Sequence, residues 1–287
     1  MRLSVVVQNI KLGALRDAWG NPDDRWPLIF QRIESIGEPP DLVLFQEASD
    51  WEKYGHRQLA AAMHDLDMDA MPIPPSSSGL PPVILYRRET VGRWQNWNTD
   101  FAQETLHGFG VAVFDIGLPQ PLAVISAHLN PFSPDKARAE AKLLATRASR
   151  YGPYGIVGGD INYPPASVEH PDPDYAAMRP YNRSARTRLP SESDGALVPD
   201  RRVTETLSYS GFVDAAWRLY ETTGDKSLLR RTGSDDRIDQ LWVSEPLADT
   251  VVEYRLLDIP EGASDHAGFM VRLDLSKAAT NDPWEYR

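Results

Sequence analysis

The sequence has no cysteine and no long apolar run. Because none of its 287 residues is a cysteine, the chain forms no disulfide and offers no thiolate ligand, so a bound metal would be held by oxygen or imidazole. No apolar run approaches the roughly 18 residues that a membrane-spanning helix needs. The apolar run at residues 3–8 has no small-residue cleavage site behind it, so it predicts a first strand and not a signal peptide. We therefore expect a cytoplasmic protein without a membrane span.

Lysine is scarce, and acidic residues are in excess. The 30 basic residues comprise 24 arginines and six lysines against 41 acidic residues, which gives a formal net charge of −11. This balance argues against a general nucleic-acid coat protein, because phosphate binding depends mainly on Lys and Arg. A net acidic charge is still compatible with a local basic site. Arg179, Arg183, Arg186 and Arg188 fall within ten residues that contain no acid. They suit bidentate phosphate contact, although a solvated loop with scattered charge explains the pattern equally well.

Apolar runs and helical spacing alternate along the chain. They predict strands at residues 3–8, 41–46, 68–73, 83–87, 91–97, 110–116, 122–127, 237–243, 250–257 and 267–275, with a further short strand ending at 157. Helices are expected at residues 24–36, 53–66, 133–150 and 202–210. Many buried strands with flanking helices indicate an α/β (α+β) protein, in which two sheets pack together with helices outside. No linker divides the chain, so we expect a single domain at residues 1–275 and a loosely held C-terminal tail at 276–287.

The central stretch, residues 155–165, ends a short apolar strand with two glycines, an acid and an amide. Asp160 and Asn162 are two residues apart, and on an extended backbone their side chains would point to the same face. Pro164 and Pro165 then stop the strand. An Asp-x-Asn turn that closes a strand is the alternative interpretation.

Polar residues recur at the ends of other predicted strands. Each of these residues has a structural explanation when it is taken alone. Because all of them follow buried apolar strands, however, we expect them to line a common rim at the strand ends. Strand ends that run into loops are frequent places for active sites. The set comprises Asn9, Glu47, His128, Asn130, Asp160, Asn162, Asp239, Asp265 and His266.

These residues lie in motifs that resemble the endonuclease/exonuclease/phosphatase superfamily, the family of DNase I, the apurinic endonucleases, sphingomyelinases and inositol-polyphosphate phosphatases. The resemblance spans residues 3–275. A single motif would be weak, whereas six in this order are a strong signal. The motifs are Val-Val-Gln-Asn9, Leu-Phe-Gln-Glu47, Ile-Ser-Ala-His128-Leu, Gly-Gly-Asp160-Ile-Asn162, Arg-Ile-Asp239 and Ser-Asp265-His266. The resemblance implies a DNase I-like, four-layer α/β/β/α sandwich and a metal-dependent phosphoesterase.

The resemblance also implies a metal site. Glu47 would be the principal carboxylate ligand, with Asn9 and Asp265 beside it. Hard oxygen ligands without a thiol favour Mg²⁺ or Mn²⁺ over zinc. A phosphoester repels an attacking hydroxide, so a divalent cation and a positioned water suit this chemistry.

By the same resemblance, Asp160 would orient or deprotonate the attacking water and Asn162 would donate a hydrogen bond to the phosphate. Asp239 would fix the tautomer of His266, which contacts the phosphoryl oxygens or the water. His128 would stabilise charge that develops on a phosphate oxygen. The candidates for substrate binding are Asn130, Arg183 and Arg186.

The substrate cannot be carried over from the family. His128 places the chain nearer the DNase I, sphingomyelinase and phosphatase branches, because apurinic endonucleases are expected to carry Tyr there. Residues 163–200 match no branch and predict an insertion loop that forms part of the substrate wall. We expect a monomeric phosphodiesterase of the nuclease type, for which nucleic acid is a candidate substrate. The alternatives are a phosphomonoesterase for a small phosphorylated, lipid or inositol-type substrate, and a non-catalytic binding protein on the same fold.

Overall fold

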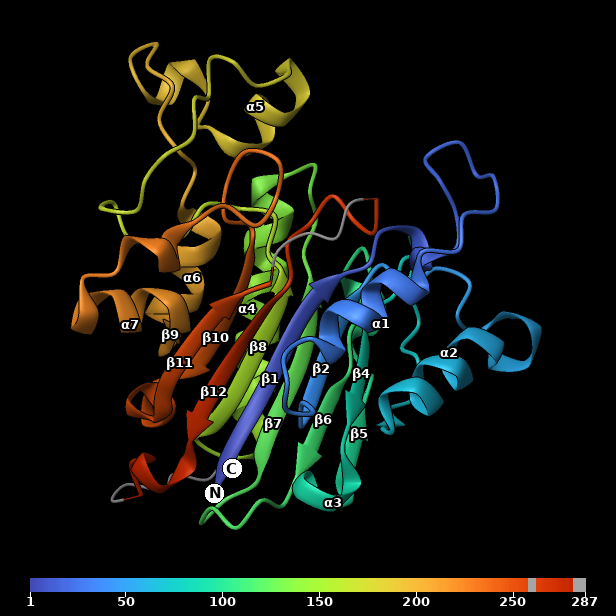
Figure 1. Cartoon of the computed structure of the whole chain (residues 1–287). Coiled ribbons are helices and arrows are strands. Elements are labelled where there is room, and N and C mark those ends of the chain that lie inside the picture. Colours follow the sequence, from blue (N-terminus) through green and yellow to red (C-terminus); the bar gives the residue numbers. More distant parts are fainter. Residues whose placement is uncertain (258–261, 281–287) are drawn as a thin grey trace.

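The computed structural model describes residues 1–257 and 262–280, which form two six-stranded sheets packed face to face (Figure 1). The first sheet has the order β11-β12-β1-β2-β4-β3 and the second has the order β5-β6-β7-β8-β10-β9. The strands of the first sheet are β1 (Arg2–Asn9), β2 (Leu42–Gln46), β3 (Asp69–Ala70), β4 (Val83–Tyr86), β11 (Val251–Leu256) and β12 (Phe269–Asp274). Those of the second are β5 (Trp94–Asn98), β6 (Val111–Phe114), β7 (Leu122–His128), β8 (Tyr154–Asp160), β9 (Phe212–Asp214) and β10 (Asp239–Ser244).

Helices cover the outer face of each sheet. The described helices are α1 (Trp26–Glu34), α2 (Lys53–Leu66), α3 (Arg88–Val91), α4 (Pro134–Ala148), α5 (Pro180–Arg186), α6 (Arg202–Tyr209) and α7 (Ala215–Thr223). The helices α1 and α2 pack on the first sheet, and α4 and α6 pack on the second (Figure 1). Ala215 and Ala216 of α7 join the core between the sheets. The expected four-layer α/β/β/α sandwich is therefore confirmed.

Alternation along the strands builds three apolar layers. In β1, Val5 and Val7 face the core between the sheets, whereas Val6 faces the layer under α1 and α2. In β7, Val124 faces the inner core and Ile125 faces the layer under α4. Because successive side chains of a strand point to opposite faces, a strand buried on both sides is a continuous apolar run.

The strand directions bring the polar strand ends to one edge. β1 runs parallel to β2, and β7 runs parallel to β8, so the carboxyl ends of each pair lie together. β10 and β12 run antiparallel to β8 and β1, so the residues at or before their first positions reach the same edge. The register sets both His128 and Asp239 opposite Asp160. Figure 1 shows α5 and the loop after β1 projecting beyond this end of the sheets.

Most of the expected elements are present, with three differences. Residues 91–97 were expected to form one strand, but α3 ends at Val91 and β5 begins at Trp94. Gly92, with a φ of +78°, changes the backbone direction between them. β9 and α7 were missed, since β9 has only three residues and runs directly into a helix that its Asp214 caps. Within the described start of the predicted tail, the Ala279 N–H donates to the Pro246 carbonyl and the Ala279 carbonyl accepts from the Tyr154 hydroxyl, so this part is held more closely than expected. Residues 281–287 lie outside the described part.

The expected insertion, residues 163–200, contains α5 and a short 3₁₀ turn at Pro190–Glu192. Buried arginines fasten it to the sandwich. Arg201 donates to the Pro165 carbonyl and to Asp172, while Arg237 donates to His170 Nε2 over 3.1 Å. This insertion is thus an ordered part of the molecule at the polar edge. In the described residues no helix is long and apolar enough to cross a membrane.

Candidate active site

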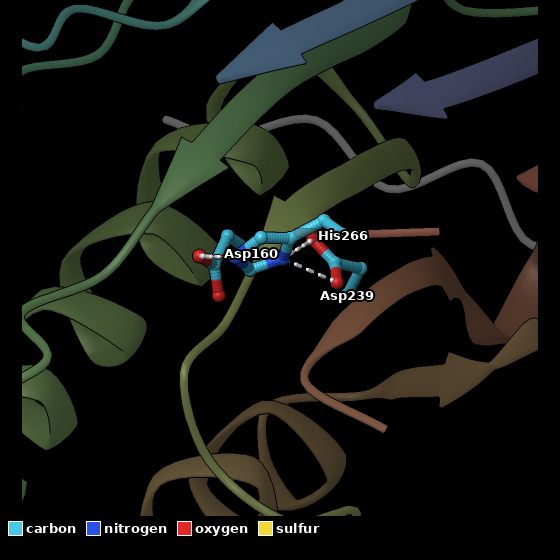
Figure 2. A group of neighbouring side chains, drawn as sticks. All are labelled: Asp160, Asp239 and His266. Carbon is cyan, nitrogen blue, oxygen red and sulfur yellow. Dashed lines mark hydrogen bonds and ion pairs between the residues drawn. The ribbon is translucent and has the colours of Figure 1, made fainter. Parts of the chain in front are cut away.

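Asp160, Asp239 and His266 form a compact cluster at the polar edge (Figure 2). Asp160 ends β8 and Asp239 begins β10, and the antiparallel register sets them side by side. His266 lies just before β12, and its Nδ1 is 2.8 Å from Asp239 Oδ2 and 3.1 Å from Oδ1. Its Nε2 is 3.9 Å from Asp160 Oδ2. The structure therefore brings together two residues that are 27 positions apart in sequence, as the family resemblance implied.

Asn9 and Glu47 join this cluster from the first sheet. Asn9 Nδ2 donates to Asp160 Oδ2 over 3.1 Å and to Glu47 Oε1 over 3.2 Å. The other Glu47 oxygen accepts from the backbone N–H of Leu12 at 3.0 Å. Glu47 has a φ of +62°, a conformation that is unusual for a residue with a side chain and that is often found at functional sites.

The Asp265 carboxylate lies further out. Its Oδ2 is 2.9 Å from Lys11 Nζ, and about half of its side chain is exposed. Burial raises the pKa of Asp265, but the hydrogen bond from Lys11 and the charge of His266 outweigh that effect and leave the pKa below its usual value. In this arrangement Lys11 already neutralises the third predicted metal ligand.

The Asp160–Asn162 segment is both a turn and a part of the site. β8 ends at Asp160, and Asn162 has a φ of +63°, so the extended backbone that would point both side chains to one face is absent. Instead, Asp160 Oδ1 accepts from the Asn162 backbone N–H at 3.0 Å, as in an Asx turn. Asn162 Nδ2 donates to the Leu129 carbonyl over 3.0 Å. An amide nitrogen carries two hydrogens, so one remains for a phosphate oxygen.

Asn130 is fixed by its own turn. Its Oδ1 accepts from the backbone N–H groups of Phe132 and Ser133 at 2.9 Å and 3.0 Å. This bonding places Ser133 at the start of α4, where its hydroxyl caps the helix. A contact of Asn130 with substrate would therefore have to come from its amide nitrogen.

The two candidate arginines of the insertion differ. Arg186 Nε is 3.2 Å from Oδ2 of the buried Asp236, three residues before Asp239. Arg183 forms no ion pair with any residue in the described ranges and is half-buried. Arg186 is thus anchored beside the cluster, whereas the Arg183 side chain is not held by an ion pair with any described residue.

His128 approaches the cluster from β7, with its Nε2 3.6 Å from Asp160 Oδ2. Its ring stacks on His107, whose centroid is 3.6 Å away with the planes inclined by only 3°. His107 was not among the predicted site residues. It lies in the loop before β6, and a single His in a Gly-containing loop carries no periodicity or motif that could have marked it.

Burial and like charge dominate the electrostatics of the cluster. Burial, together with the charges of Asp239 and Glu47, raises the pKa of Asp160 to about 7, although His266 and Arg186 act in the opposite direction. Burial alone would lower the pKa of His266, but the neighbouring Asp239, Asp160 and Asp265 raise it to about 10. The site therefore holds an imidazolium next to a carboxylate that takes up a proton near neutral pH.

The donor set fits a hard divalent cation. Asp160, Asp239 and His266 each offer a ligand atom, and these atoms lie within 4.8 Å of one another. Glu47 adds a further carboxylate through its shared contact with Asn9. Buried carboxylates are costly unless cations compensate them, and His266 and Arg186 are outnumbered here. Glu47 and Asn9 stand at strand ends of the first sheet, and Asp160 and Asp239 at strand ends of the second, so these oxygen ligands could hold such a cation between them.

Comparison with known proteins identifies the fold. Neither a protein-family model nor a curated protein matches the sequence. Among solved structures, the endonuclease/exonuclease/phosphatase from Bacteroides vulgatus is similar, with 15% identity, a TM-score of 0.65, and coverage of 96% of this chain and 99% of that one. D. rerio TDP2 in complex with a single-strand DNA product, and an AP endonuclease from Archaeoglobus fulgidus, each have 14% identity, a TM-score of 0.59, and coverage of 95% and 99%. The chain therefore has the DNase I-like fold of the endonuclease/exonuclease/phosphatase superfamily.

Proposed function

We propose that the protein is a divalent-metal-dependent phosphodiesterase of the nuclease type. The observation that carries this proposal is a connected set of contacts, in which Asn9 joins Glu47 to Asp160 and Asp239 holds His266 beside Asp160. Hydrolysis of a phosphodiester needs a base for water, positive charge near the phosphate, and a group that fixes the orientation of each. The cluster supplies all three.

Asp160 is the residue that we assign to the attacking water. Its pKa is raised to about 7, mainly by burial and by the nearby Asp239, so near neutral pH it can accept a proton from water. Oδ1 is held by the Asn162 backbone N–H and Oδ2 by the Asn9 amide, so the carboxylate cannot rotate freely. The water loses a proton to Asp160 as its oxygen forms a bond to phosphorus. The bond from phosphorus to the ester oxygen breaks, and that oxygen leaves with the electron pair and takes up a proton from solvent.

His266 supplies charge for the developing phosphorane. Asp239 accepts the Nδ1 hydrogen and thereby directs Nε2–H toward the Asp160 side of the site. Asn162 can add a neutral donor to the same phosphate oxygens. Glu47 and Asn9 would hold Mg²⁺ or Mn²⁺, which would supply Lewis-acid stabilisation of phosphate charge when bound. Asp265 would join them on release from Lys11.

Two observations favour a diester of some length over a small monoester. A cavity of about 620 Å³ begins at Asp265 and is lined by Arg230 and Arg231, which are exposed and form no ion pair with any described residue. Arg183 of α5 is half-buried and likewise forms no ion pair with any described residue. Arginines beyond the cluster suit neighbouring phosphates of a polymer. The D. rerio TDP2 structure, which has a similar fold, contains a single-strand DNA product.

A panel assay tests the proposal. Single-stranded DNA, duplex DNA, RNA and bis-p-nitrophenyl phosphate would be compared with p-nitrophenyl phosphate and inositol phosphates, in Mg²⁺ and in excess EDTA. We expect diester hydrolysis that EDTA abolishes and that Mg²⁺ or Mn²⁺ restores, with a sharp loss in Glu47→Gln, because a neutral amide is a poor ligand for a hard cation. Hydrolysis of monoesters alone would favour the phosphomonoesterase alternative. Full activity in excess EDTA would overturn the metal assignment.

We also place the protein in the cytoplasm as a monomer, with phosphoester substrates as its partners. Size-exclusion chromatography coupled to light scattering tests the monomeric state.

A further inference from the structure

His128 stacks on a second buried histidine, His107, to which no role has been assigned so far. Their ring centroids are 3.6 Å apart and their planes are inclined by 3°, while 3% of His107 and 5% of His128 is exposed. At this separation the two faces are in van der Waals contact. Rotation of the His128 ring would therefore break its contact with the His107 face.

The His128 ring lacks the support that a catalytic imidazole usually has. A functional histidine is normally held through a hydrogen bond to the nitrogen that does not face the chemistry. In His266 that bond is made by Asp239. In His128 the corresponding nitrogen, Nδ1, is buried and has no hydrogen-bond partner among the described residues, while Nε2 faces Asp160 Oδ2 at 3.6 Å.

His107 is itself held firmly. Its Nδ1 lies 2.8 Å from the Ser78 hydroxyl, and the Ser78 backbone N–H donates to the Leu106 carbonyl. The next residue, Gly108, has a φ of +78° and packs so closely that an added Cβ would lie 2.0 Å from the Pro75 carbonyl oxygen. The loop that carries His107 thus has one position available against Ser78.

Glu140 fixes the distance between the two histidine segments. This buried residue of α4 accepts from the Leu106 N–H at 2.9 Å with one oxygen and from the Asn130 N–H at 2.7 Å with the other. Leu106 precedes His107, and Asn130 lies two positions after His128. A single carboxylate therefore joins the loop of one ring to the strand end of the other.

We propose that His107 is a positioning residue of the active site, which holds the His128 imidazole by face-to-face stacking so that its Nε2 stays directed at the Asp160 carboxylate. The stack takes the place of the hydrogen bond that His128 Nδ1 lacks. His107 does not touch the substrate in this assignment, because its free Nε2 is buried. The assignment rests on the proposed phosphodiesterase activity.

Four variants separate stacking from general packing. His107→Phe keeps a flat ring but loses the bond to Ser78, His107→Leu loses the ring, Ser78→Ala loses only the bond, and His128→Ala removes the positioned group. His170→Leu is the matched control, because His170 is also buried and hydrogen-bonded but belongs to the insertion. Each protein is assayed with Mg²⁺ on bis-p-nitrophenyl phosphate and on a single-stranded oligonucleotide, after its melting temperature has been measured.

We expect His107→Leu to lower kcat by about tenfold to a hundredfold, since a small misplacement of a catalytic group has effects of this size. KM should stay within about twofold, because uniform substrate binding is untouched. His107→Phe should recover most of the loss, and Ser78→Ala should cost less than His107→Leu. In a His128→Ala background, His107→Leu should have little further effect, whereas His170→Leu should combine additively with His128→Ala.

The outcomes distinguish the inference from the function on which it rests. An active wild type with an unchanged kcat in His107→Leu and His107→Phe would overturn the positioning role and leave the phosphodiesterase assignment intact. If His107→Leu does not fold, His107→Phe and Ser78→Ala decide. If the wild type hydrolyses nothing, the proposed function fails, and long-range ¹H–¹⁵N spectra of the His128 ring then decide on the stack. The His128 ring signals should shift in His107→Leu and not in His170→Leu. Unchanged signals in His107→Leu would overturn the stacking role of His107.

Discussion

Two histidines flank one oxygen of Asp160, and the protein holds them in opposite ways. His266 Nε2 is 3.9 Å and His128 Nε2 is 3.6 Å from Asp160 Oδ2. His266 is backed by the carboxylate of Asp239, whereas His128 is backed by the neutral ring of His107. Neighbouring carboxylates raise the pKa of His266 to about 10 against the effect of burial, while burial and the nearby His266 lower the pKa of His128 to about 3. Asp239 and the other carboxylates thus keep His266 charged in spite of its burial, whereas burial and the charge of His266 leave His128 neutral.

This asymmetry suits the chemistry that we propose. A cationic His266 can oppose the charge that builds up on the phosphate. A second imidazolium in contact with Asp160 would lower the pKa of that carboxylate and weaken it as a base. His128 stays neutral, so it can offer a hydrogen bond without that penalty. The pair thus separates charge stabilisation from neutral hydrogen bonding around one base.

Asp160→Asn removes the group that the two histidines share, and it should have the largest effect. The amide keeps the volume and most hydrogen bonds but cannot accept a proton from water, so kcat should fall by about a thousandfold. Single-turnover hydrolysis of bis-p-nitrophenyl phosphate measures the loss, with circular dichroism as the check on folding. An Asp160→Asn enzyme within tenfold of wild type would assign the base elsewhere.

Asp239→Asn removes the carboxylate that backs His266. It would disturb the tautomer and the charge of His266 with little change in volume, and we expect a loss of at least about a hundredfold in kcat. Because Asp239 and His266 act as one unit, the double variant with His266→Ala should be little worse than His266→Ala alone. Multiplicative losses in single-turnover experiments would contradict the pairing.

The neutral side of the comparison can be tested through stability. Burial, followed by the neighbouring His128, lowers the pKa of His107 to about 3, and an unfolded histidine titrates near 6.5. The stability that depends on a neutral His107 is therefore fully present above about pH 6.5. It is lost as the pH falls from 6.5 toward 3, because only the unfolded chain takes up the proton. Between these limits His107→Phe should reduce the slope of unfolding free energy against pH by about 1.4 kcal/mol per pH unit. Urea unfolding in EDTA from pH 7 to pH 4.5 measures it, and parallel curves for both proteins would show that His107 is protonated in the folded state.

The sequence predicts both histidines of this comparison and the carboxylate that backs His266, but not the ring that backs His128. Asp239 and His266 lie in motifs at strand ends, and parallel and antiparallel strand directions bring such ends to one edge. His107 lies in a loop, and its partner Ser78 is 29 positions away without any periodic relation. Glu140 has the pattern of a solvated helix charge, although it is buried and joins the two loops. Strand ends are therefore accessible to pattern analysis, whereas contacts between irregular loops depend on tertiary packing.

Substitution of Arg186 or Arg183, the two candidate arginines of residues 163–200, should have the smallest effects. These arginines lie outside the two histidine pairs that are compared. Arg186 is a further cation whose charge lowers the pKa of Asp160, and it is also the ion-pair partner of the buried Asp236. Arg186→Ala would leave that carboxylate unpaired, so it should reduce thermal stability as well as substrate binding.

Arg183 has no ion pair within the described ranges, so Arg183→Ala should leave the melting temperature unchanged. Its KM for a single-stranded oligonucleotide should rise by about three- to tenfold with kcat preserved, if it supplies uniform binding. The increase should shrink at high salt, because phosphate contacts are screened, and it should be absent with bis-p-nitrophenyl phosphate, which has no neighbouring phosphate. An unchanged KM and salt response for Arg183→Ala would leave this arginine as solvated surface, and a normal melting temperature for Arg186→Ala would show that Asp236 does not depend on it.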